Sequence, residues 1–227
     1  TKVMMFAFDE NDDEAMEAIA FLDVGILSTS LTSLKNYFFL GDIYRSGMFC
    51  VWQEEPPKLI LLGQDGHKLP IVCVEFMLQA QSLFLVASDV FGNIHIFSYA
   101  PNNLMSNAGT KLVKKGQFHV GTRVVKFIRF SLSDSTQGLY YFGQDGAIGV
   151  LFPIQEKLFK RVQSIFHRFL GSTAMPLGLN AKAHRMDLQN ESSALVHNFV
   201  TRSVLDCDLV NHFCCANRVC QRDTVHF

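Results

Sequence analysis

One pattern occurs three times in this chain and limits what it can fold into. Two short apolar runs are separated by a polar turn, and an Asp follows the first run each time. Such runs, bounded by Asp, Gly and Asn, indicate β-hairpins. The turn acids recur at intervals of roughly 50 residues. The three copies are FFLGDIYRSGMFCVW (38–52), LFLVASDVFGNIHIF (83–97) and LYYFGQDGAIGVLFPI (139–154).

Further apolar runs of strand length flank each hairpin, and turn residues separate them. A unit of four strands that recurs every 40–50 residues or so is typical of a β-propeller blade. The runs are nearly continuous rather than alternating, which favours strands that are buried on both faces. The predicted strands are 25–34, 36–42, 47–55 and 58–65 in one blade, 69–78, 82–89, 92–101 and 110–121 in a second, and 123–132, 138–145 and 147–155 in a third.

The repeat therefore predicts a mainly β fold over residues 1–154, a partial β-propeller of about three four-stranded blades. Three blades cannot close a ring, because propellers use roughly four to eight. Residues 1–8, TKVMMFAF, have the character of the last strand of an earlier blade, and residue 1 is Thr rather than Met. We expect the chain to be a fragment of a longer protein, or another part of the protein to complete the ring.

The repeated acids Asp42, Asp89 and Asp145 are interpreted as turn residues. An Asp before a Gly-containing turn accepts hydrogen bonds from its own backbone and tolerates a tight reversal. Because each acid belongs to a different blade, the sequence does not indicate that they form one metal or acid–base site.

The apolar spacing becomes helical after the third hairpin. In QEKLFKRVQSIFHRFLGS (155–172) the apolar residues recur at three- and four-residue intervals, which predicts an amphipathic helix. Residues 176–186 indicate a short helix, and residues 193–216 one or two more. We expect residues 155–227 to be a small α-helical C-terminal domain with an irregular Cys-rich tail.

Composition and motifs favour a protein without catalytic activity. The 20 Lys and Arg residues are balanced by 21 Asp and Glu residues, so a global positive field for nucleic acid is absent. No run reaches the 18 or so apolar residues that a membrane span needs. A nucleophile elbow, a Walker loop, a dinucleotide loop and a zinc-protease helix are all missing, and GQDG at 63–66 and 143–146 indicates a turn. We expect no enzyme, no cofactor and no membrane partner.

Cysteine and histidine residues were considered as metal ligands or catalytic groups. Cys50 and Cys73 lie in strand-like runs, where a thiol behaves as a small hydrophobe. No secretory signal precedes them, which favours a reducing compartment. His119 has no visible Ser, Cys or acid partner and is interpreted as a structural or interface residue. The tail lacks the paired C-x2-C spacing of zinc sites, so we predict no metal site among Cys207, His212, Cys214, Cys215, Cys220 and His226.

Basic residues cluster at 111–129 and on the polar face of the predicted helix. A solvated surface is the ordinary interpretation, and the alternative is a site for an acidic protein partner or an RNA backbone. Few aromatic residues are interleaved with them, so base stacking is not indicated. Together with two apolar residues of the helix, the candidate interface residues are Phe159, Phe166, Lys160, Arg161, Lys114, Lys115 and Arg123.

Six stretches of the chain are informative through their order and spacing rather than through one motif. They are AIAFLDVG (18–25), KNYFFLGDIYRS (35–46), FLVASDVFGNIHIFSYAP (84–101), GQFHVGTRVVKF (116–127), DGAIGVLFPIQEKLFKRV (145–162) and LGLNAKAHRM (177–186). Together they resemble a known family, the large subunit of the cleavage and polyadenylation specificity factor, in its C-terminal region. The resemblance covers about residues 18 to 210.

The resemblance implies an array of three β-propellers with a small helical domain at its end. It also implies a nuclear scaffold in pre-mRNA 3′-end formation that holds a zinc-finger subunit and a WD-repeat subunit, which read the AAUAAA signal. Contact with RNA would then be mainly indirect. The alternative is a propeller adaptor of a cullin ubiquitin ligase or of the splicing machinery, since both have relatives of this architecture. The sequence departs from the family pattern in CCANRVCQRDTVHF (214–227).

Overall fold

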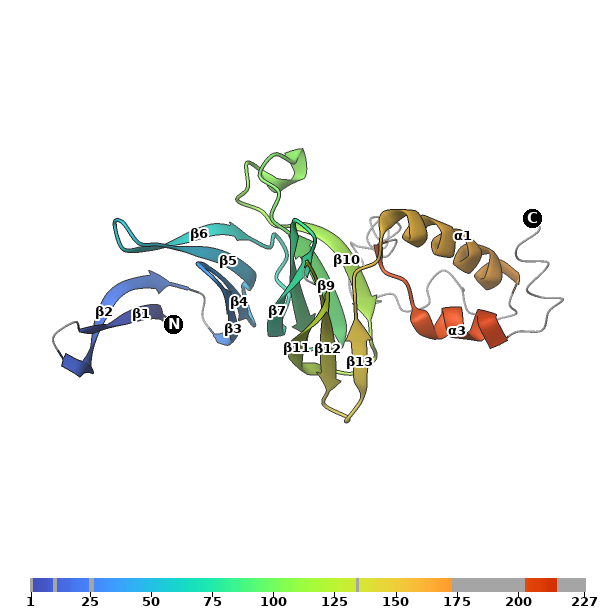
Figure 1. Ribbon diagram of the computed structural model, residues 1–227, viewed down its shortest axis with the longest axis horizontal. Coiled ribbons are helices and arrows are strands. Elements are labelled where there is room, and N and C mark those ends of the chain that lie inside the picture. The colour runs from blue at the N-terminus through green and yellow to red at the C-terminus, as the bar shows by residue number, and fades with distance from the viewer. Residues whose placement is uncertain (1, 10–11, 25–26, 134, 173–202, 216–227) are drawn as a thin grey trace. The chain divides into compact units, whose positions relative to one another are not determined.

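The computed structural model describes residues 2–9, 12–24, 27–133, 135–172 and 203–215 (Figure 1). The chain divides into two compact units, residues 1–115 with 120–152, and residues 116–119 with 153–227. Within the described residues, the first unit is built mainly from antiparallel strands. The helices α1 and α3 belong to the second unit.

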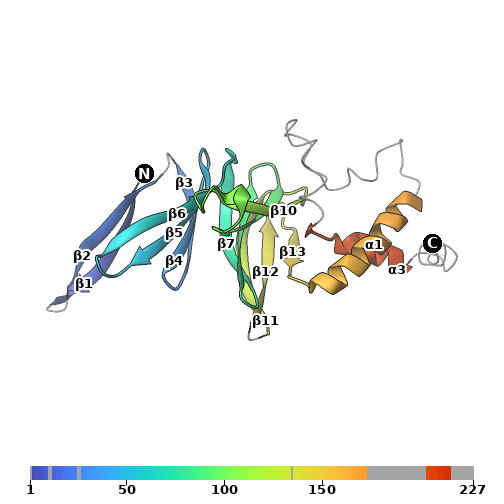
Figure 2. The same ribbon diagram turned by 90° about the horizontal axis from the view of Figure 1, so that it is seen from above.

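The strands of the first unit form successive sheets, and chain neighbours pair in an antiparallel way. Figures 1 and 2 both show the first sheets side by side, in chain order. The first sheet has two strands, β1 (Lys2–Asp9) and β2 (Asp12–Asp23). The second has four, β3 (Ser28–Leu34), β4 (Tyr37–Asp42), β5 (Ser46–Gln53) and β6 (Lys58–Gln64).

Two further sets of strands share one continuous sheet. A single register pair, Thr136 with Gln79, joins them. The first set is β7 (Ile71–Gln79), β8 (Ser82–Asp89), β9 (Asn93–Ser98) and β10 (Val113–His119), with a short 3-10 helix (Leu104–Ser106) before β10. The second set is β11 (Val124–Ser133), β12 (Thr136–Gly143) and β13 (Ile148–Leu151). We call β3–β6, β7–β10 and β11–β13 the first, second and third blade.

The predicted fold class is confirmed: the chain is mainly β, with propeller-like blades and a small helical C-terminal part. Each predicted strand between residues 25 and 155 has a counterpart in the structure. β2 was not predicted, because its first residues, Asp12, Asp13 and Glu14, are all acidic and favour a loop. β1 pairs with β2, so β2 rather than β1 is the last strand before the first blade.

Three apolar clusters hold the sheets together. The first lies between the β1–β2 sheet and the first blade, where Val3, Met5 and Leu22 pack against Phe38, Leu40, Met48, Cys50 and Leu59. The second joins the first and second blades and contains Phe39, Phe49, Phe76, Leu85 and Phe97. The third joins the second and third blades through Cys73, Met77, Val86, Ile94, Val124, Phe127 and Leu139. Neighbouring residues such as Leu85 and Val86 thus enter different clusters, which confirms burial on both faces for the apolar runs of the first and second blades. The run of the third blade is buried on one face only.

The β1–β2 sheet and the third blade each leave an apolar face open. Their inner faces pack against the neighbouring blade, while the side chains that alternate with them are exposed. On β1 and β2 these exposed residues are Met4, Phe6, Phe8, Met16 and Phe21, and on the third blade they are Val125, Ile128, Tyr140, Ile148 and Val150.

The second unit contains α1 (Glu156–Ser172) and α3 (Cys207–Cys215) among its described residues. The predicted helix at 155–172 is confirmed, and α3 lies within the predicted helical segment 193–216. The rings of Phe169 and Phe213 meet edge to face, with centroids 5.5 Å apart. The short helix predicted at 176–186 lies outside the described residues.

Candidate interaction surfaces

The repeated Asp residues organise the turns of their hairpins, as the sequence predicts. In each turn, Oδ1 of the Asp accepts the backbone N–H of the residue two positions later. The distances are 2.8 Å for Tyr44 on Asp42, 2.9 Å for Phe91 on Asp89 and 3.0 Å for Ala147 on Asp145. Asp42 and Asp89 are fully buried, whereas Asp145 is exposed. The same residue type therefore forms the same local geometry in both buried and exposed turns.

Asp89 is part of a buried polar network that the sequence did not reveal. Its Oδ1 also accepts the N–H of Asn93 at 2.8 Å. Its Oδ2 accepts the side-chain amide of Asn93 at 2.8 Å and lies 2.9 Å from Nε2 of His95. His95 is fully buried, and its Nδ1 has no hydrogen-bond partner in the structure. Burying Nδ1 without a partner costs less free energy when it carries no proton than when it is a charged N–H group. The neutral ring with its proton on Nε2 therefore fits the site.

The electrostatics of the pair agree with this assignment. Burial lowers the pKa of His95, and the positive charge of Lys114 adds to the effect, which outweighs the opposing effect of the hydrogen bond that His95 donates to Asp89. Burial would raise the pKa of Asp89, but the hydrogen bonds from His95 and Asn93 hold it below its usual value. The site therefore holds an ionised carboxylate that receives a hydrogen bond from a neutral imidazole.

A fourth Asp turn, at Asp65, follows the last strand of the first blade. Asp65 Oδ1 accepts the N–H of His67 at 3.2 Å, and its Oδ2 accepts the hydroxyl of Ser46 at 2.7 Å. Ser46 belongs to the turn of Asp42, so the two turns are bonded to each other. The GQDG motif predicts the turn at Asp65 but contains no signal for the bond to Ser46, which is 19 residues away.

A second network links the first strands of all three blades. Glu75 on β7 is largely buried, and its Oε1 accepts the hydroxyl of Thr32 on β3 at 2.8 Å. The same oxygen lies 3.2 Å from Nε of Arg129 on β11. One shared carboxylate therefore joins the first strands of the three blades.

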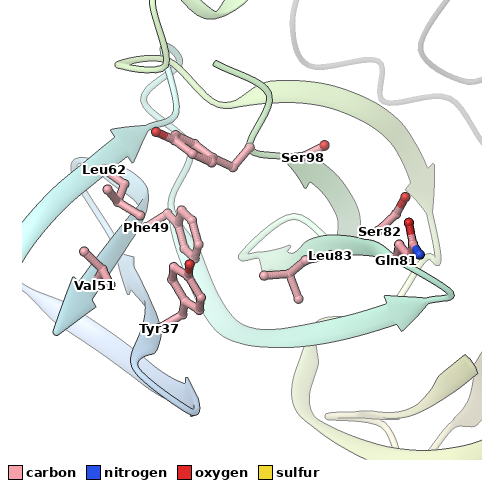
Figure 3. A pocket seen from close by; sticks show the side chains of 9 residues that line it. Tyr37, Phe49, Val51, Leu62, Gln81, Ser82, Leu83 and Ser98 are labelled. Carbon is pink, nitrogen blue, oxygen red and sulfur yellow. The ribbon is translucent and has the colours of Figure 1, made fainter. Parts of the chain in front are cut away.

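A groove of about 570 Å³ opens between the first and second blades (Figure 3). One wall carries Tyr37 and Phe49, whose rings stack with centroids 5.5 Å apart. The facing wall is more polar and includes Ser82 and Ser98. The groove lies at the end of the blades opposite the Asp turns, because the β7–β8 turn lines it.

The predicted interface residues fall on separate parts of the chain. Lys114 and Lys115 are on β10, with Lys115 the more exposed, and Arg123 is exposed in the connection from β10 to β11. On α1, Lys160 and Arg161 are exposed, and Lys160 forms an ion pair with Glu156 one turn earlier. Phe159 and Phe166 of the same helix are half-buried.

The five cysteines that the structure describes are free thiols. Cys50 and Cys73 are buried free thiols, and burial raises the pKa of Cys50 to about 12. In the part of the chain that the structure describes, no group of three or more His, Cys, Asp and Glu side chains is placed to hold a metal ion. Cys220 and His226 lie outside the described residues. His119 is half-buried at the end of β10.

Comparison with known proteins gives the family. A family model described as the CPSF A subunit region matches residues 1–215. The chain belongs to this family. It is 35% identical over 205 residues to the probable cleavage and polyadenylation specificity factor subunit 1 of Oryza sativa subsp. japonica, an alignment that covers 86% of this chain and 14% of that protein.

Further members of the CPSF A subunit family match over a similar range. Cleavage and polyadenylation specificity factor subunit 1 of Arabidopsis thaliana is 32% identical over 205 residues, covering 87% of this chain and 14% of that protein. Protein cft1 of Schizosaccharomyces pombe is 27% identical over 225 residues, an alignment that covers 93% of this chain and 15% of that protein. The chain thus spans about one seventh of the length of these relatives. No helix among its described residues is long and apolar enough for a membrane span.

Proposed function

We propose that the chain is part of a scaffold subunit of the nuclear machinery that cleaves and polyadenylates pre-mRNA. It organises the subunits that recognise the AAUAAA signal, a zinc-finger subunit and a WD-repeat subunit, and has no catalytic activity of its own. The observation that carries the proposal is the family match over residues 1–215, with relatives named as cleavage and polyadenylation specificity factor subunit 1.

The blades have physical properties that a scaffold needs. Buried carboxylates hold the turns, and the apolar clusters between the blades hold the sheets, so the surface loops are presented from a rigid body. The open apolar faces of the β1–β2 sheet and of the third blade favour association with further protein, because contiguous exposed apolar surface is unfavourable in water.

We propose the helical domain, residues 155–227, as a docking element. The half-buried Phe159 and Phe166 on α1 supply apolar contacts to a propeller or a partner subunit. The exposed Lys160 and Arg161 on the same helix, together with Lys114, Lys115 and Arg123, favour an acidic protein surface.

Co-purification from nuclear extract tests the proposal. Affinity purification of the complete tagged protein should recover the zinc-finger and WD-repeat subunits of the polyadenylation machinery. Replacing both Phe159 and Phe166 with Asp should abolish their recovery, because two charges would be buried in an apolar contact. The matched control replaces both with Leu, which keeps the apolar surface and should leave recovery unchanged.

Two results would contradict the scaffold role. One is normal recovery of all subunits by the double Asp variant at normal protein levels. The other is recovery of a cullin ligase in place of polyadenylation subunits by the unaltered protein, which would favour the ubiquitin-ligase adaptor instead.

A further inference from the structure

The exposed side of α1 carries a stripe of cations with one serine at its centre. With 3.6 residues per turn, five exposed residues of this helix lie within roughly 100° of its circumference. Four of them are basic, and the serine is the only one without a charge. We call these residues, Lys157, Lys160, Arg161, Ser164 and Arg168, the basic stripe.

The positive charge of the basic stripe is mostly uncompensated. Lys160 forms an ion pair with Glu156 one turn earlier. The other three cations of the stripe have no carboxylate within 4.0 Å among the described residues. Ser164 is exposed, and its hydroxyl makes no hydrogen bond to any described residue. The hydroxyl is therefore accessible for chemical modification.

The residues before Ser164 match the charge pattern that basophilic Ser/Thr kinases select. Such kinases bind cations on the N-terminal side of the acceptor, above all an Arg three residues before it. Arg161 lies at that position, and Lys160 lies directly before it. Ser164 is the only serine or threonine in the 227-residue sequence with a Lys or Arg three residues before it. The pattern therefore singles out one hydroxyl of the chain.

We propose that Ser164 is phosphorylated by a basophilic Ser/Thr kinase, and that the phosphate reverses the charge at the centre of the basic stripe. The hydroxyl oxygen of Ser164 attacks the γ-phosphorus of Mg–ATP. The new O–P bond forms as the bond to the ADP oxygen breaks, and the hydroxyl proton passes to the catalytic Asp of the kinase. The products are Mg–ADP and a phosphoserine that carries roughly two negative charges at pH 7.

The middle turn of α1 has to open before a kinase can bind it in an extended form. The apolar side chains on either side of the acceptor, Val162 and Ile165, are only half-buried. Local opening costs less free energy where few buried apolar contacts are lost. Ser164 thus lies in a segment that local opening presents to an enzyme.

Three cations of the basic stripe can pair with the phosphate once it is attached. Residues three and four apart on a helix are neighbours, with Cβ atoms roughly 5–6 Å apart. Lys160 and Arg161 lie four and three residues before Ser164. Arg168 lies four residues after it. Charge-assisted hydrogen bonds from these side chains to the phosphate keep the helix formed, and they also withdraw the cations from an acidic partner.

The consequence for docking rests on the proposed function, whereas the modification itself does not. Without the phosphate, the basic stripe favours an acidic protein surface. With the phosphate, the centre of the stripe is negative, and like charges across the contact repel each other. Phosphorylation of Ser164 should therefore release α1 from that surface.

Phosphopeptide mapping of the complete protein tests the modification. Mass spectrometry should find phosphate on Ser164 when the protein is purified in its complex from cells with phosphatase inhibitors. A purified kinase that selects Arg three residues before the acceptor should transfer phosphate from Mg–ATP to the same residue. Arg161→Gln should lower the rate of this transfer at least about tenfold. Lys157→Gln is the matched control, because it removes the same charge seven residues before the acceptor, and it should leave the rate unchanged.

Recovery of the polyadenylation subunits from nuclear extract measures the consequence for docking. The complete tagged protein is treated with the kinase and Mg–ATP before it is added to extract that contains phosphatase inhibitors. Treated protein should recover the subunits roughly tenfold less well than untreated protein. Ser164→Ala treated in the same way should recover them as well as the untreated protein, because it has no acceptor hydroxyl.

Three results would overturn the inference: no phosphate on Ser164 in the protein from cells, equal rates of transfer to Arg161→Gln and Lys157→Gln, or equal recovery by phosphorylated and untreated protein. The outcomes also separate this inference from the scaffold role. Normal recovery by the untreated protein without phosphate on Ser164 would reject this inference alone. Phosphate on Ser164 in a protein that recovers no polyadenylation subunit would instead contradict the proposed function.

Discussion

At the scale of single residues, the repeated Asp shows how one local role can carry different energetic weights. Asp89 and Asp145 both accept the N–H of the second residue in their turns. Asp89 also receives hydrogen bonds from Asn93 and His95 in a site without water access, whereas Asp145 remains in contact with solvent. Hydrogen bonds to a buried charge contribute more than the same bonds at a surface, because removing the acceptor leaves buried donors unpaired.

Replacing Asp89 and Asp145 with Asn, one at a time, should show how much more the buried acid contributes to stability than the exposed one. Asp89→Asn turns an acceptor into a group whose NH2 cannot satisfy the surrounding donors, and it should lower the free energy of unfolding by roughly 2–4 kcal/mol. Asp145→Asn is the matched control and should have a much smaller effect, since water can replace the lost acceptor. Urea denaturation followed by tryptophan fluorescence measures both variants, and equal losses of stability would show that burial of Asp89 adds nothing to its role.

The Asp89–His95 pair also predicts a loss of stability in acid. The pKa of His95 is lowered in the folded state, so the unfolded chain takes up this proton first as the pH falls. Stability should therefore decrease below the unfolded pKa of His, about 6.5, and continue to fall toward the lower folded value. The lowered pKa of Asp89 acts in the same direction at more acidic pH, because its stabilising charge is lost on protonation.

A non-titrating replacement isolates the contribution of His95. In His95→Gln the side-chain amide can still donate to Asp89 but takes up no proton between pH 7 and 5. Thermal unfolding across that range should show a smaller decline for this variant than for the unaltered chain, even if its midpoint at pH 7 is lower. A decline of the same size in both would place the responsible group elsewhere.

At the scale of elements, α1 and α3 depend on each other through few contacts. Phe169 is the buried residue of α1 whose ring meets Phe213 of α3 edge to face. Nine-residue helices such as α3 are too short to be stable alone in water, so α3 relies on packing contacts, and this ring pair is one of them.

Truncating the side chain of Phe169 should therefore destabilise α3. Phe169→Ala should cost about 2–4 kcal/mol in the unfolding of the helical unit, since a buried aromatic ring and its partner contact are both lost. The comparison is Leu158→Ala on the same helix, which is 51% exposed and should change little. Hydrogen exchange at the amides of α3 is the measurement, and unchanged protection in Phe169→Ala would contradict the expected coupling.

Elements were easier to predict than sites in this chain. Continuous apolar runs ended by Asp and Gly gave the strands of three blades, and the three- and four-residue spacing gave α1, because both signals are local. β2 was missed because its acidic start hides a strand that is stabilised by pairing with β1. His95 and Glu75 were missed for a related reason: a His or Glu inside an apolar run does not show that a partner, such as Arg129, lies on another strand.

At the scale of the whole molecule, the blades are joined by apolar packing between faces and by a polar link between their first strands. Apolar packing is tolerant of small shifts, since many side chains can adjust together. Glu75 is less tolerant, because one oxygen must reach both Thr32 on the first blade and Arg129 on the third. We infer that this carboxylate fixes the relative positions of the three first strands.

A double-mutant cycle measures how strongly Glu75 couples the second blade to the third. Glu75→Gln and Arg129→Met each remove the ion pair, and their combined effect should fall short of the sum by about 1 kcal/mol. The expected value is modest because the Arg129 side chain is 31% exposed and solvent screens part of the attraction. Glu75→Gln alone should also weaken the contact with Thr32, so a cycle with Thr32→Val should show coupling between the first and second blades.

The exposed pair of Lys2 and Asp23 in the β1–β2 sheet provides the control for this cycle. Its side chains are 60% and 72% exposed at a separation of 3.8 Å, so Lys2→Met and Asp23→Asn should be additive. Both cycles are measured by urea denaturation at low and high salt. Coupling at Glu75 that survives high salt while the control shows none supports a partly buried link between blades. Additive effects in both cycles would mean that packing alone positions the blades. The hydrogen bonds and the ion pair of Glu75 would then not couple one blade to another.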